Sequence, residues 1–158
     1  MIKKLLSFTL AALTAASVSS SLASFGTANV RSLLKEDSLV VYDEDLGYLK
    51  GIFPDTAVKA FKSNFISDIT VKDASGNAAS DDAPVGTDFT VTADGAEFKT
   101  LVYGDVNRDG KVDTKDVIFM IRKSIGWDID ANMTAFDVNR DGTQNSKDII
   151  TVIRKLVG

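Results

Sequence analysis

The sequence predicts an α+β protein: a small β-α-β-β-β module followed by an all-α domain of two calcium loop-helix units. Two observations lead to this prediction. Near the C-terminal end, a twelve-residue acidic loop and the apolar helix that follows it both occur twice. Before these repeats, short runs of β-branched and aromatic residues alternate with turn residues, which is typical of strands. The chain is therefore expected to have a β-rich part and then a helical part.

The N-terminal residues have the pattern of a secretory signal peptide. Two lysines near the start precede an apolar run that ends at Val18, and small residues follow up to Ala23. A positive region, a short hydrophobic region and a small-residue cleavage site are the parts of such a peptide. The apolar run is shorter than the ~20 residues that a membrane span needs. We therefore predict a signal peptide at residues 1–23, cleaved after Ala23 or after Ala28, and a secreted, extracellular protein without a membrane anchor.

After a linker at residues 24–35, residues 36–103 are predicted to form the small α+β module. Apolar residues recur at helical spacing from Val58 to Phe65, which indicates a short helix. Asp94-Gly95 is a hairpin signal between the last two strands. The predicted elements are a strand at 39–42, a helix at 56–65, and strands at 69–72, 89–92 and 97–103.

The first acidic loop, Asp105–Asp116 (loop 1), has the residue spacing of a calcium site. Calcium binds six to eight oxygens, and an EF-hand loop supplies them from positions 1, 3, 5, 7, 9 and 12, with a glycine at position 6. Gly110 stands at position 6, and an Asp replaces the usual Glu at position 12. The predicted ligands are the side chains of Asp105, Asn107, Asp109, Asp113 and Asp116 and the backbone carbonyl of Lys111.

The pattern returns 32 residues later in Asp137–Asp148 (loop 2), with Gly142 at position 6. A single copy could be a simple turn, because Asp, Asn and Gly favour turns for local reasons. A repeat that continues into the following helix indicates a duplicated supersecondary unit instead. We therefore predict two calcium ions, the second bound by Asp137, Asn139, Asp141, Asn145, Asp148 and the backbone carbonyl of Thr143.

Each loop is followed by a helix with one apolar stripe, and the two stripes are expected to pack against each other. They consist of Val117, Met120, Ile121 and Ile125 in the first helix and Ile149, Val152, Ile153 and Leu156 in the second. The same spacing of Ile129, Met133 and Phe136 in the connecting segment predicts a short third helix. Trp127 is expected in the core, with an exposed, sugar-stacking Trp127 as the alternative.

The duplicated loop with one exiting helix resembles the type I dockerin family over residues 104–158, because the strand-like run before loop 1 replaces the entering helix of an EF-hand. The β-rich module also resembles units that precede dockerin repeats in secreted clostridial proteins. The resemblance implies calcium-dependent binding to a cohesin-like module of a scaffold protein in an extracellular polysaccharide-degrading assembly, the cellulosome. It further implies that loop positions 10 and 11 and a late basic pair in each helix contact the partner. These residues are Thr114, Lys115, Arg122 and Lys123 in the first unit and Ser146, Lys147, Arg154 and Lys155 in the second. Late cations also complement the helix dipole, so a structural role for them stays open.

Composition argues against catalysis and against nucleic-acid binding. The chain of 158 residues has no His, no Cys and a formal net charge of −4, which excludes His-based triads and thiol nucleophiles and gives no clustered basic face. Glycoside cleavage needs two acids in a shaped cleft, which a module of about 68 residues seldom builds. We therefore predict a non-catalytic protein. Two alternatives remain: the loops cap and stabilise the module intramolecularly, or the module makes a weak polysaccharide contact through Tyr42, Tyr48, Phe53 and Tyr103.

Overall fold

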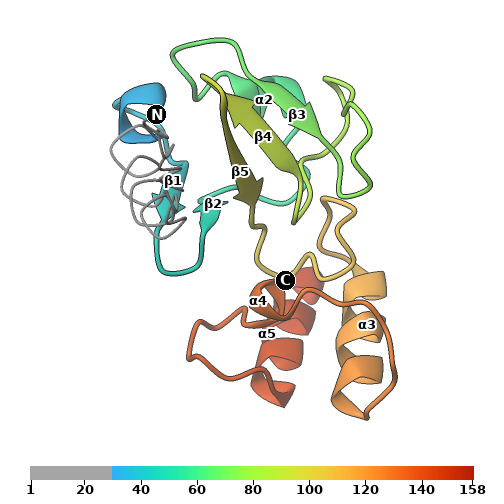
Figure 1. Cartoon of the computed structure of the whole chain (residues 1–158). Helices are drawn as coiled ribbons and strands as arrows, with labels where there is room; N and C mark the ends of the chain where they lie inside the picture. The colour runs from blue at the N-terminus through green and yellow to red at the C-terminus, as the bar shows by residue number, and fades with distance from the viewer. Residues whose placement is uncertain (1–29) are drawn as a thin grey trace, which may run out of the picture.

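The computed structural model describes residues 30–158. It contains a five-stranded sheet with α2 behind it and three further helices after the sheet, and residues 30–33 are also helical (Figure 1). The predicted signal peptide lies outside the described residues. None of the helices in residues 30–158 has the length and apolar character that a membrane crossing requires. The elements are β1 (Val41–Asp43), β2 (Tyr48–Lys50), α2 (Val58–Lys62), β3 (Thr70–Lys72), β4 (Thr90–Ala93), β5 (Ala96–Thr100), α3 (Thr114–Ser124), α4 (Met133–Phe136) and α5 (Ser146–Val157).

The sheet has the strand order β1-β2-β5-β4-β3, and its pairs are antiparallel except for the parallel pair β2–β5. The sequence of elements is therefore β-β-α-β-β-β, and the predicted β-α-β-β-β order was wrong because it lacked β2. This strand has three residues, and only Leu49 is buried, so its own sequence carries no alternation long enough to recognise. It forms by pairing with β1 in register Tyr42↔Leu49 and with β5 in register Leu49↔Thr100.

Two hydrophobic cores lie one above the other. The first fills the space between the sheet and α2, and Phe61 and Val91 are fully buried in it. Val30, Leu33 and Leu34 also belong to this core, so the prediction of a linker at 24–35 was wrong for residues 30–35: their apolar side chains pack against the sheet domain. We call the part of the chain built around this core the β-rich module.

The second core holds the C-terminal helices together, with Met120 of α3, Phe136 of α4 and Val152 of α5 fully or almost fully buried. Leu101, which directly follows β5, and Val106, at position 2 of loop 1, are buried in the same core. The helix predicted between the two units is present as α4, but it covers only Met133–Phe136, and Ile129 lies outside it. Loop 1 joins the two cores, because the side chain of Val112 packs against both.

The apolar stripes on the helices are only partly buried. Val117 and Ile149 are half-buried, whereas Ile121 and Ile153, at equivalent positions of the two units, remain 43% and 40% exposed. Ile125 and Leu156 are exposed too, so the prediction that the whole stripes pack together was wrong. The two helices meet through Met120 and Val152, with Val117 and Ile149 partly buried beside them, and the outer half of each stripe faces solvent.

Trp127 was also predicted wrongly, because its side chain is 53% exposed. It follows the end of α3, and the Arg122 guanidinium lies over its ring, 5.2 Å from the centroid. A cation above an aromatic ring is attracted by the ring's quadrupole. The indole therefore covers the C-terminal end of α3 rather than filling the core.

Candidate calcium centre and docking surface

Loop 1 is held in its curled shape by the carboxylate of its first residue. Asp105 is buried. Its Oδ1 accepts a hydrogen bond from the backbone N–H of Asp109 at 2.9 Å, and its Oδ2 accepts one from that of Gly110 at 3.2 Å. Two amides from the middle of the loop are thereby turned toward position 1. The chain reverses between them in the way that an EF-hand loop requires.

The last residue of the loop closes it and also starts the helix. Asp116 is buried, and its Oδ1 accepts from the backbone N–H groups of Val106 and Asn107 at 3.0 and 3.3 Å. Its Oδ2 accepts from the N–H of Asp113 at 3.0 Å, while the Asp113 side chain caps the first turn of α3. Asp113 and Asp116 thus form a capping box, which satisfies free N–H groups at the helix start. The same carboxylates that are predicted to hold calcium also define where α3 begins.

Loop 2 repeats this arrangement. Asp137 accepts from the N–H groups of Asp141 and Gly142 at 3.1 and 2.9 Å. Asp148 is buried and accepts from Asn139 and Asn145, at 3.1 and 3.0 Å. Asn145 and Asp148 form the capping box of α5. The internal geometry of the two loops is therefore nearly the same, as their sequences predict.

Two positions in each loop have a left-handed backbone. At position 6, Gly110 and Gly142 have φ of 79° and 81°, which glycine adopts at no steric cost. At position 4, Arg108 and Arg140 have φ of 68° and 59°, a conformation that few non-glycine residues adopt. The two arginines therefore share the same unusual backbone conformation.

The electrostatics of loop 1 favour a bound cation. Burial raises the pKa of Asp105 to about 6, although the hydrogen bond from the Thr87 backbone N–H lowers it, and the nearby charge of Asp116 raises it further. Burial likewise raises the pKa of Asp116. Buried carboxylates are stabilised in the charged form by an opposite charge, and a hard cation such as calcium prefers oxygen donors. The donor chemistry of the loop fits calcium.

The described side chains include no converging group of three or more His, Cys, Asp or Glu. The predicted ligand sets include four Asp side chains in loop 1 and three in loop 2, together with the amides Asn107 and Asn139 and the backbone carbonyls of Lys111 and Thr143. These ligand sets therefore stay predictions. In loop 2, hydrogen bonds from the side chain and backbone of Thr143 hold the pKa of Asp141 below its ordinary value. Asp141 therefore stays ionised at neutral pH in an exposed loop.

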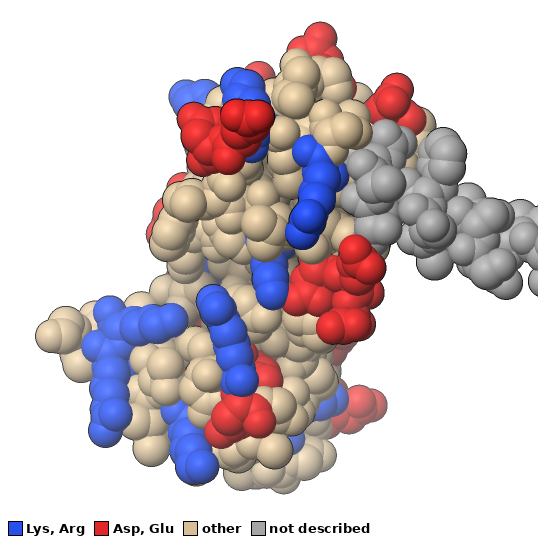
Figure 2. Space-filling view, turned by 90° about the vertical axis from the view of Figure 1, so that its left-hand side faces the viewer, with Lys and Arg blue, Asp and Glu red and all other residues tan. Residues whose placement is uncertain are grey.

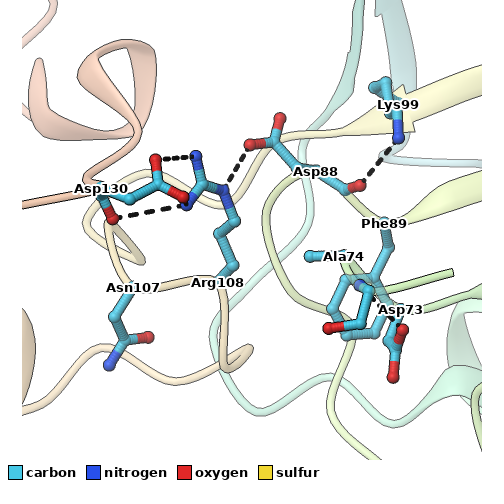
Figure 3. A pocket seen from close by; sticks show the side chains of 9 residues that line it. Asp73, Ala74, Asp88, Phe89, Lys99, Asn107, Arg108 and Asp130 are labelled. Atoms are coloured by element: carbon cyan, nitrogen blue, oxygen red, sulfur yellow. Dashed lines mark hydrogen bonds and ion pairs between the residues drawn. The ribbon is translucent and has the colours of Figure 1, made fainter. Parts of the chain in front are cut away.

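The surroundings of the two loops differ, and the residues responsible were missed by the sequence analysis. Arg108 extends from loop 1 toward the β-rich module, where its Nε lies 2.6 Å from Oδ2 of Asp88, and its Nη1 lies 2.9 Å from Asp130 (Figure 3). Asp88 also accepts hydrogen bonds from the Tyr48 hydroxyl at 2.8 Å and from Nδ2 of Asn132 at 2.9 Å. In the sequence, the only indication of this contact was an arginine at position 4 of the loop, because its partners are distant in sequence.

Burial and hydrogen bonding act against each other at Asp88. Burial raises the pKa of this carboxyl group, but the hydrogen bonds from Arg108, Asn132 and Tyr48 outweigh it and hold the pKa below its ordinary value. Asp88, Arg108 and Asp130 line an open, polar hollow of about 680 Å³ between the module and loop 1 (Figure 3). Every charged group named here is paired, so the hollow is best described as the edge of a contact between two parts of the chain.

The residues predicted to contact a partner lie on the helical part of the molecule, where Figure 2 shows several basic side chains gathered over its lower portion. Seven of the eight are exposed, and Lys123 is half-buried. The Lys123 Nζ donates to the carbonyl of Ile129 at 3.1 Å, and Arg122 lies over Trp127. Arg154 and Lys155, at the equivalent positions of α5, have no such contact with any described residue. The two basic pairs are thus equivalent in sequence but not in their surroundings.

The aromatic side chains proposed as a sugar-stacking strip are dispersed. Tyr42 packs edge-on against Phe98 of the first core, with ring centroids 5.6 Å apart. Tyr48 and Tyr103 pack against the second core, and the Arg140 guanidinium lies 4.5 Å from the centre of the Tyr103 ring. Among the four, only Phe53 is an exposed large side chain. Three of the four rings are therefore engaged in internal packing.

Two buried-carboxylate loops, each continuous with a capped helix, define the C-terminal region as a duplicated calcium-binding loop-helix domain. Residues 103–157 match the model of the family described as dockerin type I domain. This region is a type I dockerin domain. Such domains are non-catalytic interaction modules that bind calcium.

One chain of a crystal structure described as a complex of a CaDoc0917 variant with CaCohA2 at pH 5.4 has 31% sequence identity and a TM-score of 0.35. The alignment covers 36% of this chain and 98% of that chain. No curated protein matches the sequence.

Proposed function

We propose that this protein is secreted and that its dockerin domain binds a cohesin-like module of a scaffold protein in a calcium-dependent manner. The interaction anchors the chain to an extracellular polysaccharide-degrading assembly. The observation that carries the proposal is the coincidence of metal ligand and helix cap: Asp116 and Asp148 close their loops and also cap α3 and α5. A cation that orders the loops therefore also orders the helices that bear the proposed contact residues.

The proposal includes two calcium ions, one in each loop, with the ligands predicted from the sequence. It also includes domain boundaries near residues 36–103 for the β-rich module and 104–158 for the dockerin domain, and a signal peptide at 1–23. A domain of about 55 residues buries a core of marginal size, and this one has no disulfide because the chain has no Cys. Calcium bound only to the folded state would add roughly 3–4 kcal/mol at 100 to 1,000 times its dissociation constant.

The second loop-helix unit is proposed as the main contact face. Arg154 and Lys155 project from α5 without an internal partner among the described residues, and Ile150 and Ile153 are exposed on the same helix. Exposed apolar side chains surrounded by charged ones are typical of protein-binding surfaces. In the first unit, Arg122 and Lys123 would have to give up their contacts with Trp127 and Ile129 before binding.

The test is calorimetric titration of the full chain into purified type I cohesin modules, in excess calcium and again after chelation with EDTA. We expect binding only in calcium. Replacement of both Arg154 and Lys155 by Ala should weaken binding more than replacement of both Arg122 and Lys123, which serves as the matched control. Binding that persists in EDTA, or the absence of binding to any cohesin, would contradict the proposed function. Equal effects of the two double variants would contradict the choice of face.

The β-rich module is proposed to be non-catalytic, and a weak polysaccharide contact would have to use Phe53. A second candidate function is that the calcium loops act as an intramolecular cap of this module. It is supported by the contacts of Arg108 with Asp88 across the two parts of the chain. Removal of residues 104–158 distinguishes the two functions. If the dockerin domain serves to bind a partner, the remaining module should stay folded. If the loops stabilise the module intramolecularly, the remaining module should unfold.

A further inference from the structure

We infer that the β-rich module completes the first calcium loop, so that calcium binding at loop 1 and the docking of the two domains are one coupled event. The inference rests on the calcium binding proposed above. It assigns a positioning role to Gly86 and Thr87, which lie outside the loop. The underlying observation is an asymmetry. The two loops share most of their internal hydrogen bonds, but among the described residues the β-rich module encloses loop 1 and not loop 2.

The most direct contact is a hydrogen bond to a predicted calcium ligand. The backbone N–H of Thr87 donates to Oδ2 of Asp105 at 2.6 Å, and both residues are buried. At the equivalent place in loop 2, Oδ2 of Asp137 accepts from Gly142 within its own loop, and no described residue of the module donates to it. Groups that hydrogen-bond a metal ligand fix its orientation and influence metal affinity. The module thus holds the position-1 carboxylate of loop 1 and not that of loop 2.

The side chain of Thr87 keeps its own amide in place. Its hydroxyl donates to the carbonyl of Val102 at 3.1 Å and accepts from the N–H of the same residue at 3.2 Å. Val102 lies in the first core, three residues before Asp105. Thr87, which donates the bond, is therefore hydrogen-bonded to Val102, and Asp105, which accepts it, follows Val102 closely in the chain.

Two glycines allow the backbones to approach closely. A Cβ on Gly86 would lie 2.6 Å from the carbonyl oxygen of Arg108, and a Cβ on Gly110 would lie 2.9 Å from the backbone of Pro84. The carbonyl of Gly110 also accepts from the backbone N–H of Asp55 at 2.9 Å. Around Gly142 there is nothing within 4 Å of such a Cβ. Position 6 of loop 1 is thus buried against the module, whereas position 6 of loop 2 is open.

These contacts couple calcium binding at loop 1 to the docking of the β-rich module, in both directions. Straightening loop 1 would break the bonds from Thr87 and Asp55 and the ion pair of Arg108 with Asp88. A ligand that favours the curled loop must therefore favour the docked module, and by thermodynamic reciprocity the docked module must favour the ligand. Loop 1 then serves as a calcium-dependent joint inside the chain, and loop 2 with α5 is left free to face another protein.

The first test is a calcium titration of the full chain followed by the backbone amide signals in nuclear magnetic resonance spectra. We expect the signals of Thr87 and Asp55 in the module to shift with the same midpoint as that of Gly110. If Gly110 and Gly142 respond while Thr87 and Asp55 do not, calcium binds but the joint is refuted. If none of the four responds, the proposed calcium binding itself is refuted.

The second test compares Gly110→Ala with Gly142→Ala. Both substitutions place a Cβ at nearly the same positive φ, so the backbone strain is matched, and only the first also meets Pro84. We expect Gly110→Ala to lower the melting temperature of the calcium-saturated chain further than Gly142→Ala and to shift the amide signals of Asp55 and Thr87. Equal losses, with unchanged module signals in both variants, would overturn the inference.

Discussion

Arg108→Ala should destabilise the protein more than Arg140→Ala, although both arginines occupy position 4 of a calcium loop with similar backbone angles. Arg108 pairs with Asp88, and each of these side chains is 22% exposed, whereas its second partner, Asp130, is 88% exposed. A hydrogen bond to a charged group contributes about 1.5–3 kcal/mol, and an exposed ion pair about 0–1 kcal/mol. We therefore expect a loss of about 2 kcal/mol, which comes almost entirely from Asp88.

Arg140 provides the matched control. Its guanidinium lies over the ring of Tyr103 at 4.5 Å, and an exposed cation–π contact contributes about 0.5–1 kcal/mol. For a chain of this size, 1 kcal/mol corresponds to roughly 2–4 °C in melting temperature. Thermal unfolding followed by circular dichroism in excess calcium should therefore give a decrease of about 4–8 °C for Arg108→Ala and about 1–4 °C for Arg140→Ala. Equal decreases would refute the reasoning, because they would mean that the contact with the module contributes nothing.

Three further predictions follow from the same geometry. Chelation with EDTA should reduce the helical circular dichroism signal, and an unchanged spectrum would contradict the role of calcium in folding. A calcium titration should reveal two affinities. Loop 1 should be the tighter site because it carries one more carboxylate and the module encloses it. The depressed pKa of Asp88 means that its contribution to stability is present above the unfolded pKa of about 3.9 and is lost as pH falls through the lower folded pKa. In urea unfolding, the advantage of the wild type over Asp88→Asn should therefore persist from neutral pH to about pH 4 and disappear in stronger acid, whereas a pH-independent difference would exclude this ion pair as its source. Met120→Ala should cost about 2–5 kcal/mol because the side chain is fully buried, while Ile121→Ala, at a side chain that is 43% exposed, should cost clearly less in the same assay.

The calcium loops could be predicted because their determinants are local. An oxygen donor at every second position and a glycine at position 6 impose one backbone path, and the observed hydrogen bonds from Asp105 and Asp137 follow it in both copies. The helix starts are local as well, because the residues at positions 9 and 12 form capping boxes. These residues were predicted as calcium ligands from the sequence, but their second role as helix caps was not predicted.

The errors concern elements that exist only through contacts with distant residues. β2 is a strand because Leu49 lies between β1 and β5, and three residues carry no periodicity of their own. Helical spacing predicted one continuous apolar stripe on α3, but spacing does not tell how much of a stripe the neighbouring helix covers. Met120 faces α5 and is buried, whereas Ile121 remains exposed. Trp127 is exposed, and its ring contacts the Arg122 guanidinium instead of the core.

The difference between the two loops shows how far a repeated sequence can diverge in role without diverging in pattern. Gly110 and Gly142 satisfy the same backbone requirement, yet only Gly110 lies against another part of the chain. Arg108 and Arg140 leave their loops at the same position, yet one meets an aspartate of the module and the other an aromatic ring. The β-rich module directly precedes the first copy, and among the described residues it encloses that copy and leaves loop 2 open. A duplicated domain attached at one end therefore acquires one enclosed unit and one open unit, and the open unit is the one with its basic residues free for another protein.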